Sequence, residues 1–427
     1  MYCEKDHWDW EPGAREVADI DSWKSEHSYV EEVYASPDGE KAAAVVKTEE
    51  GEFSLRVNDA TWEPSFDRAW YPRFAPDGRL TALVSSGGEW TLAIDGVLWE
   101  NGFDFAWDTR LGADGAHAVV AVQRGGRYAA AVDGEAWEDD FADFTGLAVS
   151  EDGLHAAAVV QTKPFGQADI ETFQQGCYSV AVDGKVWDRS FVNAWNPALS
   201  PDGVRSAATV RTSLYDYSIA VDGEPWKASF PCAWEPRFNP KDGSVWAPVK
   251  TPGGWTLFRD GERAWKKDFV ELWRHSFSPD GKRVAAVVAK TFGRWTVAVD
   301  GKPWSATFGD MVTDLAWSPD GARAAATGKD KGRWTIVVDG KPWPASFDRV
   351  WPPVWSPDGR HTAARVKKNG SETVAVDGRL ISESFVKVFT PSWSPDGTKL
   401  LVRGVRTAAS AGRAYVRSVV SLSEFLG

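Results

Sequence analysis

The chain repeats a short turn motif that ends in Asp-Gly, and this repeat limits its possible folds more than any other feature. The segments DGKPWPASFDRVWPPVWSPDG (339–359) and DGRLISESFVKVFTPSWSPDG (377–397) are two neighbouring copies. Successive turn glycines are separated by 39, 37, 38, 50, 40, 38, 40, 38 and 38 residues, which is a fixed period with one insertion. The turn glycines are Gly39, Gly78, Gly115, Gly153, Gly203, Gly243, Gly281, Gly321, Gly359 and Gly397.

Each period predicts four short β-strands and leaves no room for a helix. In Ser-Pro-Asp-Gly the proline has its φ angle already fixed at the second turn position, which is typical of a type I turn between strands. Small β-compatible runs such as KAAAVVK follow, and then a second Asp-Gly, as in WTVAVDG, gives a strong hairpin signal. Four strands of five or six residues and their turns account for roughly 38 residues.

These units predict an all-β fold, a β-propeller of about ten four-stranded blades. A small antiparallel sheet cannot bury both faces alone, so such sheets stack face to face around an axis. After Gly397 the chain has only two strands, TKLLVRGVR and GRAYVRSVVSL, and DSWKSEHSYVEEVYASPDG near the N-terminus matches the other half of a unit. We therefore expect closure by pairing of N- and C-terminal strands, which removes free sheet edges.

The predicted domain organisation is an N-terminal tail, residues 1–18, followed by one propeller domain, residues 19–427. Two five-bladed propellers are the alternative. The segment that would join them, Pro236–Gly243, shows neither a linker nor a second closing strand.

Composition excludes several classes of function. A net charge of −13 and a pI near 5.1 argue against nucleic acid, which is bound mainly through Lys and Arg. The three cysteines form no CxxC pair, so no disulfide framework, zinc site or other cofactor is predicted. Cys3 and His7 have a spacing that two metal ligands could adopt, but nothing nearby completes a site. The N-terminus lacks the apolar segment of a secretory signal, so we expect a cytoplasmic protein.

The polar and aromatic residues of the repeat are interpreted as structural. The turn aspartates occupy positions where Asp bonds its own backbone. His117, His155 and His361 hold the position that Arg or Lys holds in other copies. One repeat position carries nine of the 25 tryptophans, which favours a role in the core: Trp23, Trp62, Trp99, Trp137, Trp187, Trp226, Trp265, Trp304 and Trp343. The chain contains no HExxH, GxSxG, GxGxxG or GxxxxGK[ST] motif, and we do not expect an enzyme.

Partner binding is assigned to the loops between the second and third strands of the units. Most of these loops, such as QRGGR, KTFGR and KDKGR, are basic, and the single insertion, Gln161–Gly176, is a loop of the same kind. Both kinds of loop should share one face, where aromatic anchors and cations meet an acidic partner or anionic lipid. The predicted partner-binding residues are Lys163, Phe165, Ile170, Phe173, Arg294, Lys329, Arg333 and Lys368.

The WSPDG turn and its variants resemble the PD40 (TolB-like) branch of the WD40-like propellers, over about residues 23–421. VDGxxW followed by FxxxWxP, together with 25 tryptophans, more narrowly resembles the tryptophan-rich TmcD subunits of the Tmc transmembrane electron-transfer complexes of sulfate-reducing bacteria. That resemblance implies a scaffolding subunit on the cytoplasmic side of the membrane, beside an iron–sulfur protein and a membrane cytochrome. A general protein-interaction propeller and a ligand-binding propeller associated with a hydrolase are the alternatives.

Overall fold

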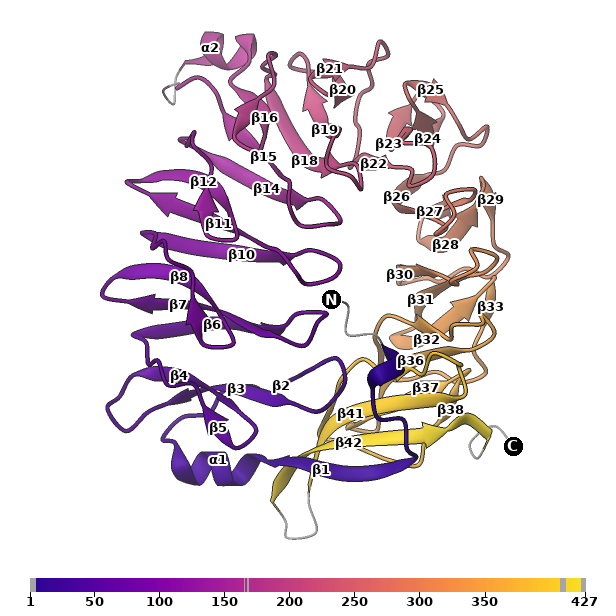
Figure 1. The fold of residues 1–427 in the computed structure, drawn as a ribbon. Helices are drawn as coiled ribbons and strands as arrows, with labels where there is room; N and C mark the ends of the chain where they lie inside the picture. The colour runs from indigo at the N-terminus through magenta and orange to yellow at the C-terminus, as the bar shows by residue number, and fades with distance from the viewer. Residues whose placement is uncertain (1–4, 165, 167–168, 408–411, 424–427) are drawn as a thin grey trace. The chain divides into compact units, whose positions relative to one another are not determined.

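The chain folds into ten blades of a β-propeller, as its repeat predicts (Figure 1). The computed structural model describes residues 5–164, 166, 169–407 and 412–423. Each blade is an antiparallel sheet, and the blades are numbered here in chain order. Blades 9 and 10 have five strands because prolines, which lack the N–H that a ladder needs, interrupt the first strand at Pro352, Pro353 and Pro391.

The strands of blades 1 to 5 are β2 (Tyr34–Ala35), β3 (Ala42–Lys47), β4 (Phe53–Val57) and β5 (Ala60–Thr61); β6 (Arg68–Phe74), β7 (Leu80–Ser86), β8 (Glu89–Ile94) and β9 (Val97–Leu98); β10 (Phe105–Leu111), β11 (Ala118–Arg124), β12 (Arg127–Val132) and β13 (Glu135–Ala136); β14 (Phe144–Val149), β15 (Ala156–Gln161), β16 (Tyr178–Val182) and β17 (Lys185–Val186); β18 (Asn193–Leu199), β19 (Ser206–Arg211), β20 (Tyr217–Val221) and β21 (Glu224–Pro225).

The strands of blades 6 to 10 are β22 (Arg237–Phe238), β23 (Val245–Thr251), β24 (Gly254–Arg259) and β25 (Glu262–Arg263); β26 (Glu271–Phe277), β27 (Val284–Thr291), β28 (Arg294–Val299) and β29 (Lys302–Pro303); β30 (Met311–Trp317), β31 (Ala324–Asp330), β32 (Arg333–Val338) and β33 (Lys341–Pro342); β34 (Arg349–Val350), β35 (Val354–Trp355), β36 (Thr362–Lys368), β37 (Ser371–Val376) and β38 (Arg379–Leu380); β39 (Lys387–Val388), β40 (Ser392–Trp393), β41 (Lys399–Thr407), β42 (Arg413–Ser421) and, from the N-terminus, β1 (Gly13–Asp19).

The chain forms two compact units. The first comprises Met1–Val84, Ile94–Gly96 and Ser276–Gly427, and the second comprises Ser85–Ala93 and Val97–His275. The second unit runs without a break through Pro236–Gly243, where two five-bladed propellers would have to separate. Blade 6 is built there from consecutive strands, so that alternative is not what the chain adopts.

The Asp-Gly hairpin turns of the blades have the predicted geometry. In the hairpin between β12 and β13, Asp133 and Gly134 both have positive φ, 48° and 95°, which is the type I′ geometry that matches strand twist. The Asp133 carboxylate accepts a hydrogen bond of 2.9 Å from the N–H of Ala118 and contacts His117 Nδ1 at 2.6 Å. His155, His361, Arg205, Arg283 and Arg323 make the same contact in other blades, which confirms their structural interpretation.

Seven of the nine repeat tryptophans, all except Trp23 and Trp265, are shown to lie against the turn glycine of the following blade. A Cβ atom on Gly134 would lie 3.2 Å from Trp99, and one on Gly184 would lie 3.2 Å from Trp137. Glycine is therefore needed there both for its positive φ and for the close approach of the indole. Trp23, Trp265 and Trp343 are buried and the other six are half-buried, so the core interpretation of this series is confirmed.

Hydrogen bonds of these indoles predict a stabilising substitution. Trp187 Nε1 donates to Ser206 Oγ at 2.9 Å, whereas the buried Trp137 Nε1 has no acceptor among the described residues because Ala156 stands where Ser206 stands in the next blade. We expect Ala156→Ser to raise the free energy of unfolding by about 1 kcal/mol. Ser206→Ala should lower it by about 1–3 kcal/mol, since it leaves the Trp187 N–H buried and unpaired. Urea denaturation of both variants tests this; equal midpoints would contradict it.

Closure by the two ends of the chain is confirmed, although the strand that performs it was misassigned. Strand β1 pairs with β42 from Gly13 to Asp19, so the expected tail, 1–18, contains most of a blade strand. The segment 21–39 instead enters blade 1. Its first part is a short helix, α1 (Ile20–Glu26), capped by the Asp19 carboxylate. A second helix, α2 (Ile170–Gln175), lies within the insertion, so helices do occur outside the regular period.

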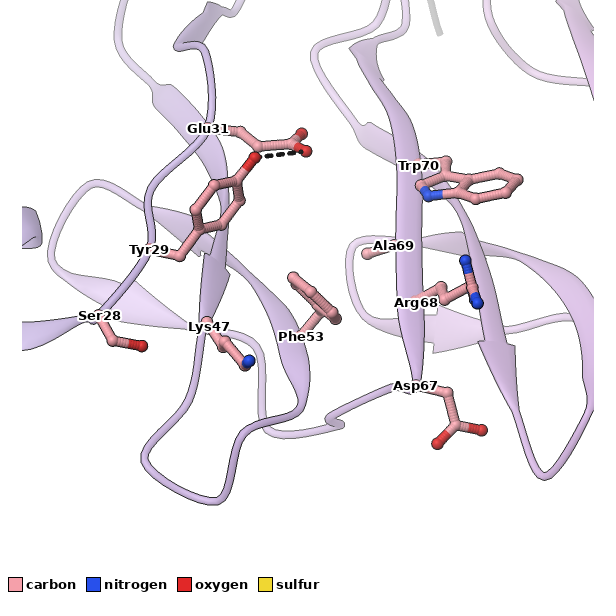
Figure 2. A pocket seen from close by; sticks show the side chains of 9 residues that line it. All are labelled: Ser28, Tyr29, Glu31, Lys47, Phe53, Asp67, Arg68, Ala69 and Trp70. Atoms are coloured by element: carbon pink, nitrogen blue, oxygen red, sulfur yellow. Dashed lines mark hydrogen bonds between the residues drawn. The ribbon is translucent and has the colours of Figure 1, made fainter.

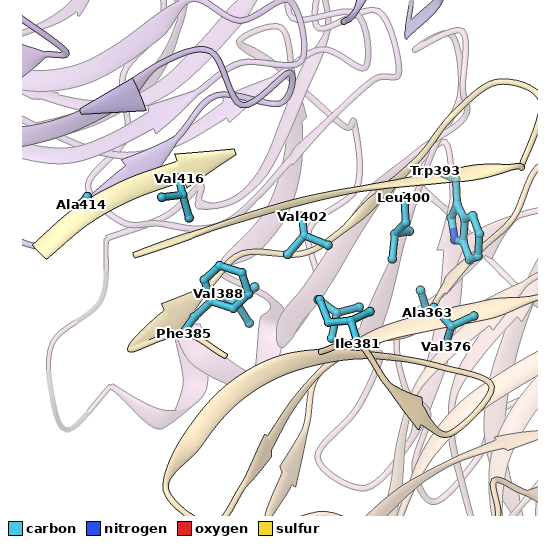
Figure 3. Packing of buried hydrophobic residues seen from close by; sticks show 11 residues of the cluster. Ala363, Val376, Ile381, Phe385, Val388, Trp393, Leu400, Val402, Ala414 and Val416 are labelled. Atoms are coloured by element: carbon cyan, nitrogen blue, oxygen red, sulfur yellow. The ribbon is translucent and has the colours of Figure 1, made fainter. Parts of the chain in front are cut away.

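The last two blades share an apolar core. Val402 and Val416 of β41 and β42, with Leu400 and Trp393, face Val376, Ile381 and Phe385 (Figure 3). All of these side chains are buried. Because β42 has β1 on its other side, this sheet has no exposed edge at β42.

Candidate functional site

A second series of tryptophans lies on or next to the first strand of the blades, at what we call the inner position. This position is held by Trp70, Trp107, Trp195, Trp234, Trp273, Trp351 and, in blade 10, Phe389. In several blades the inner aromatic packs on the first aromatic residue of the third strand. Trp234 stacks on Trp255 with ring centroids 5.5 Å apart and an interplanar angle of 11°, and Trp195 stacks on Tyr217 at 5.9 Å and 23°.

The backbone turns sharply just after the inner position. The next residue is in the left-handed region in several blades, as in Asp108, Asn196 and Asp314, and also in the bulkier Tyr71 and Arg274. The strand pairing shifts register at this point, for example between Trp107 and Arg110, as in a β-bulge. The bulge re-aims the chain, so the indole before it keeps the same place in successive blades.

Blade 1 carries Glu31 at the inner position. The Glu31 N–H donates to Val45 O at 2.9 Å, just as the Trp234 N–H donates to Pro248 O at 2.9 Å in blade 6. The preceding residue, Val30, bridges Val46, as Ala233 bridges Val249. Blades 4 and 8 also depart from the pattern, with Thr145 and Thr313.

Beside Glu31 lies a cavity of about 590 Å³, which we call the docking groove (Figure 2). One wall comes from blade 1 and the segment before it, and the other wall is the start of β6 in blade 2. The groove is lined by Ser28, Tyr29, Glu31, Lys47, Phe53, Asp67, Arg68, Ala69 and Trp70. All nine residues belong to the first compact unit.

Aromatic rings and cations alternate along the groove. Tyr29 meets Phe53 edge to face, with centroids 6.3 Å apart, and the Lys47 ammonium lies 5.8 Å from the Phe53 ring. On the opposite wall the Arg68 guanidinium lies 5.8 Å from the Trp70 ring. These contacts orient both cations along the aromatic surface.

The hydroxyl group of Tyr29 is held by an acidic neighbour. It donates a hydrogen bond of 3.2 Å to Glu31 Oε1, and this carboxylate is the main cause that raises the pKa of Tyr29. The phenol therefore remains protonated and fixes the Glu31 side chain at the side of the groove (Figure 2). The lining supplies two carboxylates and two cations beside three aromatic rings, which suits recognition of a protein segment.

The insertion carries three of the predicted partner-binding residues that the structure describes, Lys163, Ile170 and Phe173. Ile170 begins α2 and is 65% exposed, and Phe173 in the same helix is half-buried. Lys163 is exposed, and its carbonyl accepts a hydrogen bond of 2.8 Å from Gln161 Nε2. Phe165 lies outside the described residues. The insertion belongs to the second compact unit.

The four other predicted residues lie in hairpins of the first unit, between the second and third strands of their blades. Lys329 covers the ring of Trp334 at 5.2 Å, and Arg333 forms an ion pair with Asp348. Arg294 begins β28 and Lys368 ends β36, both exposed. Asp310 and Asp348 accept hydrogen bonds from hairpin N–H groups, so acids are interleaved with the basic hairpins. Partner binding by these residues stays a prediction.

Other reactive groups are in structural roles. Burial raises the pKa of the Cys177 and Cys232 thiols, which disfavours the reactive thiolate. Cys3, which was weighed with His7 as a metal ligand, lies outside the described residues. Across the part of the chain that the structure describes, no three His, Cys, Asp or Glu side chains cluster in a way that could hold a metal ion. No helix in that part is long and apolar enough to cross a membrane.

The docking groove is not among the predicted sites. The inner tryptophans form a second series, separate from the nine that follow the hairpin turns. Placing EEVYASPDG of blade 1 against WNPALSPDG of blade 5 pairs Glu31 directly with Trp195, because both residues lie eight positions before the turn glycine. What the alignment does not give is the cavity that forms between Glu31 and the start of β6.

Comparison with known proteins does not assign the chain to a family. No protein-family model and no curated protein matches it. Among solved structures it is similar to one described as "Crystal structure of the eukaryotic initiation factor", with a TM-score of 0.48 and 13% sequence identity, covering 76% of this chain and 89% of that one.

Proposed function

We propose that this protein is a non-catalytic interaction subunit that binds a segment of a partner protein in the docking groove. The observation that carries the proposal is the groove itself, a cavity of about 590 Å³ at the blade whose inner position holds Glu31 in place of an indole. Rigid blades surround it, and recognition surfaces on rigid scaffolds lose little entropy on binding. A propeller fold is consistent with such a role.

The proposed partner is a subunit of a membrane-associated electron-transfer complex, either its iron–sulfur protein or its membrane cytochrome. The support for this is the resemblance of the VDGxxW and FxxxWxP repeats to TmcD subunits. In this proposal the protein has no cofactor of its own and lies on the cytoplasmic side of the membrane, in peripheral contact with it. It scaffolds the complex and does not itself transfer electrons.

Glu31→Trp tests the role of the groove, because it restores the side chain that the repeat places there in other blades. We expect co-purification of the natural partner under native conditions to fall at least tenfold, equivalent to about 1.4 kcal/mol of binding free energy. The melting temperature should not decrease, because the indole fills a cavity. Thr313→Trp is the matched control, since it introduces the same residue at the inner position of blade 8.

The results distinguish failure of the docking groove from failure of the electron-transfer assignment. Unchanged co-purification with Glu31→Trp would exclude the groove as the docking site. Absorption spectra and iron content show whether the captured partner contains haem or an iron–sulfur cluster. A partner with neither would exclude the electron-transfer complex, and the protein would then be a general interaction propeller.

A further inference from the structure

We infer that the docking groove takes an aromatic side chain that is flanked by an acidic residue in the partner segment. This inference rests on the proposed function and specifies the chemistry of the occupant. Two separate features carry it: the Phe53 ring, which has no inner aromatic beside it in blade 1, and the cations of the two groove walls, Lys47 and Arg68.

The aromatic part follows from the repeats of the same chain. In blades 5 and 6 the inner indole stacks on the first ring of the third strand, Tyr217 or Trp255. Phe53 is the corresponding ring in blade 1, where Glu31 replaces the indole. A partner's aromatic ring would thus occupy the place that an intramolecular ring fills elsewhere. Offset stacking of this kind is favourable beyond the area that it buries.

The acidic part follows from the charges of the two walls. Within the described residues, neither Lys47 nor Arg68 forms an ion pair, and each charged group lies 5.8 Å from the centre of a ring, Phe53 for Lys47 and Trp70 for Arg68. Glu31, by contrast, already accepts a hydrogen bond from Tyr29. Arg68 is exposed, so its guanidinium can donate two hydrogen bonds to a partner's carboxylate while it remains beside the Trp70 ring.

Short synthetic peptides test this chemistry. The probes are the acetylated, amidated peptides Gly-Asp-Trp-Asp-Gly, Gly-Asp-Ala-Asp-Gly and Gly-Lys-Trp-Lys-Gly, and binding to the full-length protein is followed by ligand-observed NMR. We expect the Asp-Trp-Asp peptide to bind at least tenfold more tightly than either of the other two. Glu31→Trp should abolish this binding, and Thr313→Trp should leave it unchanged.

A charge reversal keeps the test independent of folding. Arg68→Glu changes an exposed side chain, so it should fold normally, and it should reverse the preference in favour of the Lys-Trp-Lys peptide. Equal binding of all three peptides, or binding that survives Glu31→Trp, would overturn the inference. If no peptide binds while Glu31→Trp still releases the natural partner, the groove is a docking site with another occupant, and only this inference fails.

Discussion

Deletion of residues 1–19 is expected to make the protein aggregate and to lower its free energy of unfolding by several kcal/mol. The deletion removes β1 and leaves the nine residues of β42 as an unpaired edge of the last blade. It also removes the Asp9 carbonyl and carboxylate from around Arg417, whose side chain is buried. Loss of a partner from a buried charge typically costs about 3–5 kcal/mol. Light scattering and urea denaturation measure the two effects.

The matched control is deletion of residues 1–8, which leaves β1 and the carbonyls of Asp9 and Trp10 in place. Those carbonyls accept hydrogen bonds from Arg417 and Lys399. We expect this shorter protein to remain soluble with a nearly unchanged denaturation midpoint. If the longer deletion behaves in the same way, β1 does not protect the edge of blade 10.

Acid should destabilise the protein through a single buried histidine in blade 7. His275 is fully buried, and burial, helped by the positive charge of Arg237, lowers its pKa from 6.5 to about 3. Above pH 6.5 the imidazole is neutral in both the folded and the unfolded chain, so it imposes no penalty. Below pH 6.5 the imidazole becomes protonated in the unfolded chain, whereas in the folded chain it stays neutral until about pH 3. The free energy of unfolding should therefore fall by about 3 kcal/mol between pH 7 and pH 4.

His275→Phe isolates this contribution, because the other titrating groups are retained. The variant should lose less stability than the parent protein between pH 7 and pH 4, whatever its absolute stability. His155→Gln is a control of opposite sign. The hydrogen bond to Asp183 raises the pKa of His155, so its contribution is complete below pH 6.5 and is lost as pH rises through the folded-state value. Identical pH profiles for the parent and His275→Phe would contradict the prediction.

The repeat predicted most of the fold because its information is local. The Asp-Gly turns, the alanine-rich second strands and the tryptophans after the turns each act within one blade or between neighbours. Even the histidines could be interpreted correctly, since His117 and His361 alternate with arginines at one repeat position. Ten blades followed from counting turns.

The features that escaped the sequence depend on distant or irregular positions. Strand β1 has no repeat signature, so its pairing with β42 could not be assigned to residues 13–19 before the sheet was known. The helix α2 lies in the single insertion, which has no counterpart in other units. The docking groove depends on how Glu31 and the segment before it lie against the start of β6, and aligning Glu31 with Trp195 in the sequence does not give that placement.

The first Ser-Pro-Asp-Gly turn, residues 36–39, accepts hydrogen bonds from strands β41 and β42 of the last blade. Arg403 Nη1 donates to the carbonyls of Ser36 and Pro37, and the Tyr415 hydroxyl donates to the Gly39 carbonyl, across separations of 366 to 376 residues. During synthesis these carbonyls have no such donors until the C-terminal strands leave the ribosome, whereas each interior blade can form from adjacent hairpins as it emerges. The nascent chain therefore carries an incomplete first blade until residues 403–415 have been made, and it is in this interval that we expect it to depend most on chaperones.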